Sequence, residues 1–138
     1  WIFGNPSSDE SAEGEGSLMA IAKPAETLEE GINNLIDASI EDYRTFYDRD
    51  IDEAYANERI AAFADSFEVS EGRSYAKVIR EGSVHCFIVL KPANGDDHLK
   101  VGDVLKPAGW SAPARNRARG NVLEGNYPIN WTGPYYLK

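Results

Sequence analysis

The sequence is poor in the residues and patterns that mark enzymes, metal sites and membrane proteins. It has a single cysteine, Cys86, which rules out an internal disulfide, and only two histidines. It also lacks a glycine-rich phosphate loop, a Gly-x-Ser-x-Gly elbow and a His-Glu-x-x-His pattern. No apolar run approaches the roughly twenty residues that a membrane span needs. We therefore expect no cofactor, no metal, no catalytic residue and no membrane partner.

The acidic residues are unevenly distributed along the chain. None lies between Asp103 and Glu124, although the chain of 138 residues carries a net charge of −9. Residues 1–68 hold seventeen acidic residues against four basic ones, a net charge of −13, whereas residues 69–138 carry +4. This asymmetry indicates a surface that meets an anionic partner, or a chain whose two halves attract each other.

The length predicts a single domain that buries about two-thirds of its unfolded surface. Residues 5–17 have no large apolar side chain, so they cannot bury enough surface to offset the entropy of ordering. We therefore predict a mobile acidic segment over residues 1–24 and one domain over residues 25–138.

Two helical segments are predicted within residues 25–68. Thr27 and Glu30 match a capping box, and Asp50–Glu53 gives a second start signal. Each signal precedes apolar residues at spacings of three and four, which form one helical stripe. The stripes are Leu28, Ile32, Leu35, Ile36, Ile40, Tyr43, Phe46 and Tyr47, and then Ile51, Tyr55, Ile60, Phe63 and Phe67. We predict an antiparallel helical pair, with a single helix bent near Asp48–Asp50 as the alternative.

Residues 72–138 are predicted to be rich in β-structure. Glu81 and Gly82 form a tight turn between two strands, the second of which is apolar enough to be buried on both faces. The predicted strands are Ser74–Arg80, Ser83–Leu90, Leu99–Leu105 with a bend at Gly102, and an edge strand over Tyr127–Leu137. The expected fold class is α+β, with the helical pair packed on a small, mostly antiparallel sheet or partly open barrel.

Residues 106–121 fit neither pattern. They contain two prolines, two glycines and no apolar period, and loops of this length are usually functional or disordered. Extended, the alternating arginines would lie on one side and could follow a phosphate backbone, while a tryptophan could stack on a base. If the segment were helical from Pro113, the three arginines would spread around roughly half the circumference of the helix. The candidate nucleic-acid or anion-binding residues are Lys106, Trp110, Arg115, Arg117 and Arg119. The alternative is that these arginines pair with the acidic helices.

The two histidines give no catalytic pattern. His85 and Cys86 lie in the apolar run Val84–Leu90, so we expect a satisfied core imidazole and a small core thiol. Asp96–His98 has no second pair of ligands at a useful spacing, which argues against a metal site. Catalysis would need residues that only the fold could bring into one cleft, such as His98, Asp103, Arg115 and Tyr127.

A resemblance covers roughly the C-terminal half. Gly82–Val89, Lys100–Asn121 and Trp131–Pro134 resemble segments of small uncharacterised proteins encoded by tailed bacteriophages. The resemblance implies a viral accessory or virion-associated protein in the cytoplasm of a bacterial host. It implies no activity and no functional residue.

Two functions remain open. In the first, the chain is a non-enzymatic binding module whose basic loop binds nucleic acid or another phosphate ligand. In the second, the acidic helices bind a basic protein partner, either as a mimic of the charge of nucleic acid or as part of a virion-associated protein. The oligomeric state does not follow from the sequence.

Overall fold

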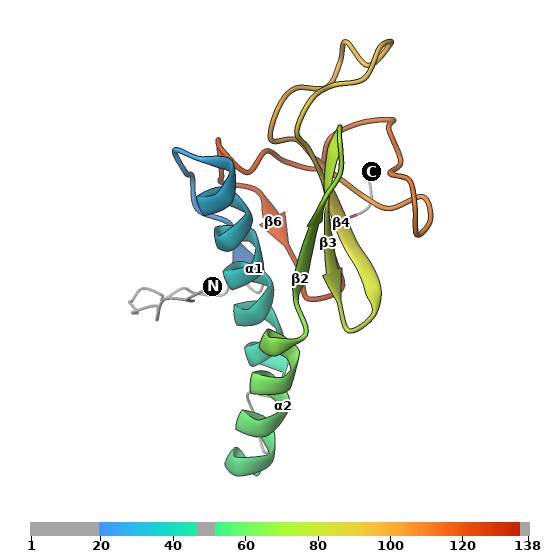
Figure 1. Cartoon of the computed structure of the whole chain (residues 1–138). Coiled ribbons are helices and arrows are strands. Elements are labelled where there is room, and N and C mark those ends of the chain that lie inside the picture. The colour runs from blue at the N-terminus through green and yellow to red at the C-terminus, as the bar shows by residue number, and fades with distance from the viewer. Residues whose placement is uncertain (1–19, 47–51, 136–138) are drawn as a thin grey trace.

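The computed structural model describes residues 20–46 and 52–135, and it shows the predicted α+β fold (Figure 1). The elements are β1 (Ala20–Ile21), α1 (Leu28–Phe46), α2 (Glu53–Asp65), β2 (Glu68–Glu71), β3 (Tyr75–Arg80), β4 (Ser83–Val89), β5 (Val104–Leu105) and β6 (Pro128–Ile129). Strands β2, β3, β4 and β5 form an open antiparallel sheet in that order, and β1 pairs with β6 in a separate antiparallel ribbon. Neither closes into a barrel within the described ranges.

Helix α1 begins as the capping box predicts. The Thr27 hydroxyl accepts a hydrogen bond from the Glu30 amide at 3.1 Å, and the Glu30 carboxylate accepts one from the Glu26 amide at 3.2 Å. The reciprocal bond therefore reaches one residue further back than in the usual box. The predicted stripe is buried through Ile32, Leu35, Ile36, Ile40 and Tyr43, whereas Phe46 is 62% exposed and Tyr47 lies outside the described residues.

Helix α2 is a separate helix that runs back beside the C-terminal end of α1 (Figure 1). Its N-cap is Asp52, whose side chain accepts from the Tyr55 amide; Asp50 and Ile51 lie outside the described residues. The predicted burial of Tyr55 is wrong, since its side chain is 51% exposed. The helical period that buries Ile60 and Phe63 reaches back to Ala56 instead.

The two faces of the four-stranded sheet carry separate cores. The face that packs on α1, α2 and the β1–β6 ribbon, here called the helix face, presents Ala76, Val78, Cys86, Ile88 and Val104. The opposite face, here called the loop face, presents Phe87, Val89 and Leu105, which pack with Leu99 and Ala118. Strand β4 is therefore central and buried on both faces, as the sequence predicts. The predicted turn is also confirmed, since Glu81 and Gly82 have φ angles of 51° and 79°.

The predicted third strand is shorter than expected. Only Val104 and Leu105 pair with β4, because residues 99–103 form a turn in which the Asp103 side chain accepts from the Lys100 amide at 2.8 Å. Gly102 has a φ of 92°, which confirms the predicted bend. The unpredicted strand β2 lies at the opposite edge of the sheet, where helical structure was expected up to residue 68.

The predicted edge strand over Tyr127–Leu137 is also mostly absent from the described residues. Only Pro128 and Ile129 form a strand, and they pair with β1 rather than with the large sheet. The Asn130 side chain accepts from the Thr132 amide at 2.9 Å and ends the strand in a turn. Trp131 packs instead on Tyr43, with ring centroids 5.2 Å apart.

The pairing of β1 with β6 brings residues 20–24 into the fold. Ala22 is 1% exposed and its amide donates to the Tyr127 carbonyl oxygen at 3.0 Å. The domain thus begins before the boundary that composition suggested at residue 24. Residues 1–19 lie outside the described residues, so their mobility stays a prediction.

Candidate anion-binding site

The loop of residues 106–121 is irregular but held by backbone hydrogen bonds. Its first part folds back on itself: the Ala114 amide donates to the Lys106 carbonyl oxygen at 2.8 Å, and the Ala108 amide donates to Ala112 at 2.9 Å. A β-bridge joins Pro107 to Pro113 beneath the tip. No helix starts at Pro113, so the helical alternative for this segment is wrong, and residues 114–121 form an irregular segment with bends at residues 116 and 119.

The second part of the loop returns along β5. The Arg119 amide donates to the Val104 carbonyl oxygen at 2.8 Å, and the Val104 amide donates to Gly120 at 2.9 Å. Ala118 packs into the core of the loop face, so Arg117 and Arg119 flank a residue that anchors the segment. That these two arginines lie on one side of the loop stays a prediction.

Arg115 differs from Arg117 and Arg119 in its contacts. Its guanidinium lies 3.3 Å from the Asp96 carboxylate, whose side chain is only 6% exposed. The Arg115 carbonyl oxygen is 2.8 Å from His98 Nε2, and because a carbonyl can only accept, this nitrogen carries the proton. Arg115 thus uses its side chain and backbone to fix the 96–98 turn. Asp96 and His98 are therefore engaged in structural contacts with Arg115.

Arg117 and Arg119 form the cationic part of the loop. The Arg117 side chain is exposed and has no hydrogen-bond or ion-pair partner among the described residues. Arg119 donates to the Asn116 side chain at 3.3 Å and to the Arg117 carbonyl oxygen at 2.9 Å, and neither acceptor carries a charge. Burial lowers the pKa of Arg119 from its ordinary value, and the charge of Arg117 acts in the same direction. Two positive charges therefore lie close together without a described acid between them.

Lys106 lies at the root of the loop, next to Arg119. Its ammonium donates to the Pro134 carbonyl oxygen at 2.6 Å. Burial lowers the pKa of Lys106, and the positive charge of Arg119 lowers it further. Lys106 therefore adds to the positive potential of the loop while it ties the C-terminal segment to β5.

Trp110 lies at the tip of the loop and is 55% exposed. Its ring packs beneath the ammonium of Lys77 from β3, 4.2 Å from the ring centroid. The same ammonium is 5.9 Å from the Phe87 ring, which is the cross-strand neighbour of Lys77. The contact of Lys77 with Trp110 could not be predicted from the sequence. The alternation of residues in β3 shows on which side of the sheet Lys77 lies, but not that Trp110 of the loop packs against it.

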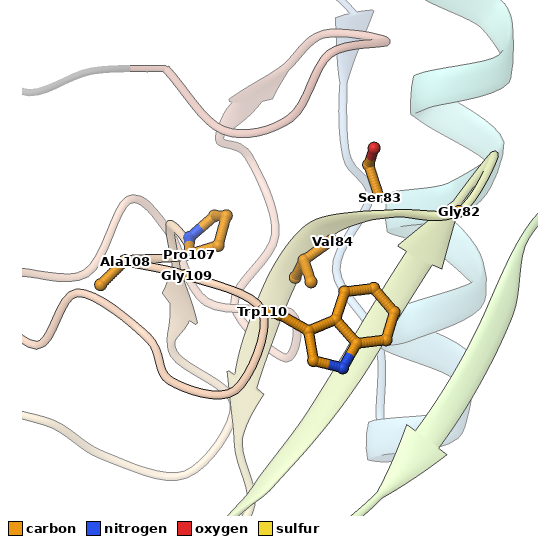
Figure 2. Close-up of a pocket in the computed structure, with 7 residues that line it drawn as sticks. All are labelled: Gly82, Ser83, Val84, Pro107, Ala108, Gly109 and Trp110. Atoms are coloured by element: carbon orange, nitrogen blue, oxygen red, sulfur yellow. The ribbon is translucent and has the colours of Figure 1, made fainter.

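A shallow, open pocket of about 320 Å³ lies beside Trp110 (Figure 2). It is lined by the β3–β4 turn and by the first part of the loop: Gly82, Ser83, Val84, Pro107, Ala108, Gly109 and Trp110. Figure 2 shows the indole extending from the loop over the start of β4, close to Val84. The loop and the sheet therefore build this pocket together.

A buried polar network fixes the far end of the loop. The Asn121 side-chain amide donates to the Asp103 carboxylate and to the Val101 carbonyl oxygen, each at 2.9 Å. The Asn121 side-chain oxygen accepts from the amides of Leu123 and Glu124. Asp103 and Asn121 are 4% and 5% exposed, so this network is structural and holds the loop against β5.

Within residues 20–46 and 52–135, no ion pair joins an arginine of the loop to the acidic helices. Among the residues that the structure describes, the ion pairs are Arg44 with Glu41, Arg80 with Glu81, Lys100 with Glu124 and Arg115 with Asp96. None of them joins a loop arginine to α1 or α2. Figure 1 shows the orange loop on the far side of the sheet from α1, which explains why the two charged regions stay apart.

His85 and Ser39 resemble a catalytic dyad in distance but not in chemistry. Their side chains are 2.9 Å apart, but both residues are at most 1% exposed. The register shift between Val78 and Ile79 lets His85 face α1, where Arg80 donates to its Nδ1 at 3.1 Å. Nδ1 must accept, so Nε2 carries the proton and donates to Ser39. The imidazole cannot take a proton from that hydroxyl, and His85 is the satisfied core residue that the sequence predicts.

Cys86 is likewise a buried core residue, and burial raises the pKa of its thiol. The residues proposed for a catalytic cleft do not converge: Tyr127 belongs to the core of the helix face, whereas His98 and Arg115 lie by the loop-face core. Within residues 20–46 and 52–135, no group of three or more potential ligands could hold a metal ion. No helix in the same ranges has the length and hydropathy needed to cross a membrane.

The family model that matches the chain covers residues 19–136, and the chain therefore belongs to a family of unknown function, DUF7717. The comparison with curated proteins found no match, and neither did the comparison with solved structures. The family match has no bearing on the resemblance to phage proteins, which stays a prediction.

Proposed function

We propose that this chain is a non-enzymatic binding module that binds nucleic acid or another phosphate ligand through its basic loop. The observation that carries the proposal is the pair of guanidinium groups on Arg117 and Arg119, which lie close together with no acidic partner among the described residues. Lys106 lies next to them and adds its charge. We call Lys106, Arg117 and Arg119 the cationic cluster.

The backbone supports the cationic cluster in a way that suits anion binding. Arg117 and Arg119 lie on either side of the anchored Ala118, and the backbone of Arg119 is bonded to β5. Little conformational entropy is therefore lost when a phosphate contacts this segment. Guanidinium groups form paired hydrogen bonds with phosphate oxygens, and these bonds are stronger than those between neutral groups.

The acidic half of the molecule supports the proposal through long-range repulsion. Exposed carboxylates of Glu53, Glu58 and Asp65 lie along α2, away from the loop face. A polyanion would be repelled there and attracted at the cationic cluster, so its approach would be oriented. Under the same proposal, an origin in a tailed bacteriophage would place this binding in a bacterial cytoplasm or a virion.

Fluorescence anisotropy with labelled DNA and RNA tests the proposal. We expect affinity that falls steeply with salt, and a loss of about tenfold or more in the double variant Arg117→Ala/Arg119→Ala, with a smaller salt slope. The matched control is Arg73→Ala/Lys91→Ala, which removes two exposed positive charges elsewhere. The single variant Arg117→Ala is the control for folding, because this side chain has no partner among the described residues and its removal should leave the fold unchanged. Equal affinities for all variants would refute the proposal.

The acidic helices support a second candidate function. The carboxylates of Glu29 and Glu30 on α1, and those of Glu53 and Glu58 on α2, are exposed and could bind a basic protein. Binding of a polylysine peptide that is lost in Glu53→Gln/Glu58→Gln, together with no binding of nucleic acid, would favour this function over the first.

A further inference from the structure

We propose that the ligand of the loop face is single-stranded nucleic acid, one base of which stacks on Trp110 in the pocket between the loop and the β3–β4 turn. This inference rests on the proposed function and specifies its ligand. It assigns a binding role to Lys77, Ser83 and Gly109, which the cationic cluster does not include.

The indole of Trp110 has the properties of a stacking platform. It is 55% exposed, and Lys77 places an ammonium 4.2 Å from the ring centroid. Lys77 does not line the pocket. An aromatic ring beside a positive charge matches a nucleotide, because the base can stack while the phosphate meets the cation.

The pocket suits a flat ring. Its volume of about 320 Å³ is near the lower end of the range for small-molecule sites, about 300–1,000 Å³. Gly82 and Gly109 line it, and at either position a Cβ atom would meet nothing within 4 Å. Open space above the backbone lets a ring approach closely. Ser83 adds a hydroxyl that can donate to or accept from the edge of a base.

The tip of the loop is held in place before any ligand binds. Hydrogen bonds join Ala108 and Gly109 to the Ala112 carbonyl oxygen at 2.9 and 3.2 Å, and a β-bridge lies beneath them. Trp110 is therefore carried by a braced turn, and ordering it on binding costs little entropy.

Stacking on Trp110 favours a single strand over a duplex. In a duplex each base is already stacked and paired, so its face cannot reach an indole unless the base is extruded. A single strand can place a base on Trp110 while its phosphates run toward Arg117 and Arg119 on the same loop. Stacking depends little on base identity, so the expected sequence preference is weak.

The test measures the affinity of the full chain for three labelled probes of equal length. They are an oligothymidylate, an abasic phosphodiester with the same phosphates, and a DNA duplex. The variants are Trp110→Ala, Trp110→Phe and Gly109→Val, the last of which fills the pocket without changing the indole or any charge. The control is Tyr55→Ala, which removes an exposed aromatic ring from α2.

We expect the native chain to bind oligothymidylate more tightly than either other probe. Trp110→Ala and Gly109→Val should each lose about tenfold or more of that affinity, with Trp110→Phe intermediate and Tyr55→Ala unchanged. Binding of the abasic probe should be the same in all of them.

Four results would overturn this inference. Equal affinity for the abasic probe and oligothymidylate, or no effect of Trp110→Ala and Gly109→Val, would remove stacking while the Arg117→Ala/Arg119→Ala result still supported the proposed function. Tighter binding of the duplex would reverse the choice of ligand. If none of the probes bound at low salt, the inference and the proposed function would both fail.

Discussion

The two faces of the four-stranded sheet differ in how they treat polar groups. On the helix face, His85 and Ser39 are fully buried and form a hydrogen bond with each other, so their polar groups are satisfied within the core. On the loop face, Lys77 and Trp110 meet at the surface over a smaller apolar cluster. One sheet therefore supplies stability through one face and a charged, aromatic surface through the other.

The difference follows from what covers each face. Helices α1 and α2 bring continuous apolar stripes, so the helix face is sealed by side chains. The loop has no such stripe and contributes only Ala118 to the second core. Trp110 and Arg117 are exposed at the surface, where they can meet a ligand. Substitutions on the two faces should therefore separate stability from binding.

The largest expected effect is on the helix side, at Gly31. A Cβ atom there would lie 2.6 Å from the Val122 carbonyl oxygen, a backbone atom that cannot easily move. Gly31→Ala should thus destabilise the protein by about 3 kcal/mol, although in an exposed helix alanine is about 1 kcal/mol more favourable than glycine. Thermal unfolding should show this loss, with Gly109→Ala on the loop unchanged. An unchanged melting temperature for Gly31→Ala would contradict the packing of α1 on residues 121–123.

The next effect is a pH dependence of the helix face. Burial lowers the pKa of His85 to about 3, and the charges of Arg80 and Lys106 act in the same direction. Below pH 6.5 the unfolded chain binds a proton that the folded chain does not, so stability falls as the pH falls toward 3. His85→Gln can keep both hydrogen bonds without titrating.

Urea unfolding of the native chain and of His85→Gln at pH 7 and pH 4 checks this dependence. The stability of the native chain relative to the variant should fall by about 3 kcal/mol between these two pH values. A constant difference would mean that His85 is protonated in the folded state, or is not enclosed.

A smaller effect should separate the arginines of the loop. Arg115→Ala leaves the Asp96 carboxylate, 6% exposed, without its cation and should lower the melting temperature. Arg117→Ala should leave stability unchanged and weaken anion binding instead. Paired melting and anisotropy measurements on the two variants test this division. Should Arg117→Ala destabilise the fold as much as Arg115→Ala, the distinction between the two side chains would be wrong.

The smallest effect concerns Asp37 on α1. Burial, opposed by the charge of Lys23, raises the pKa of this half-exposed carboxyl to about 6. An acid with a raised pKa stabilises the fold at low pH, and this contribution is lost as the pH rises from about 4 to 6. Asp37→Asn should therefore be more stable at pH 7 by less than about 1 kcal/mol, allowing for solvent screening, and equal below pH 4. A less stable variant at pH 7 would show that the charged carboxylate is favoured there.

The helices and the central hairpin could be predicted because their signals are local. The Thr27 capping box, the stripe from Ile32 to Tyr43 and the Glu81–Gly82 turn each act over a few residues, and the structure confirms them. Strand β5 was predicted too long, because the bond from the Lys100 amide to Asp103 turns the chain within that segment.

The candidate site was only partly predictable, because its contacts join residues far apart in the sequence. Composition marked residues 106–121 as an irregular basic loop, and it is one. No local sequence pattern shows that Arg115 forms an ion pair with Asp96, or that Lys77 packs on Trp110. Such pairs follow from the register of β3 and the path of the loop, which periodicity does not encode.

The most direct test of the account is a chemical-shift map of the chain during titration with oligothymidylate. We expect the signals of the Trp110 indole N–H, of the Lys77 backbone amide and of the backbone amides of residues 117–120 to shift, while those of the α2 amides stay unchanged. Shifts confined to α1 and α2, or no shifts at low salt, would contradict the claim that the loop face is the binding face.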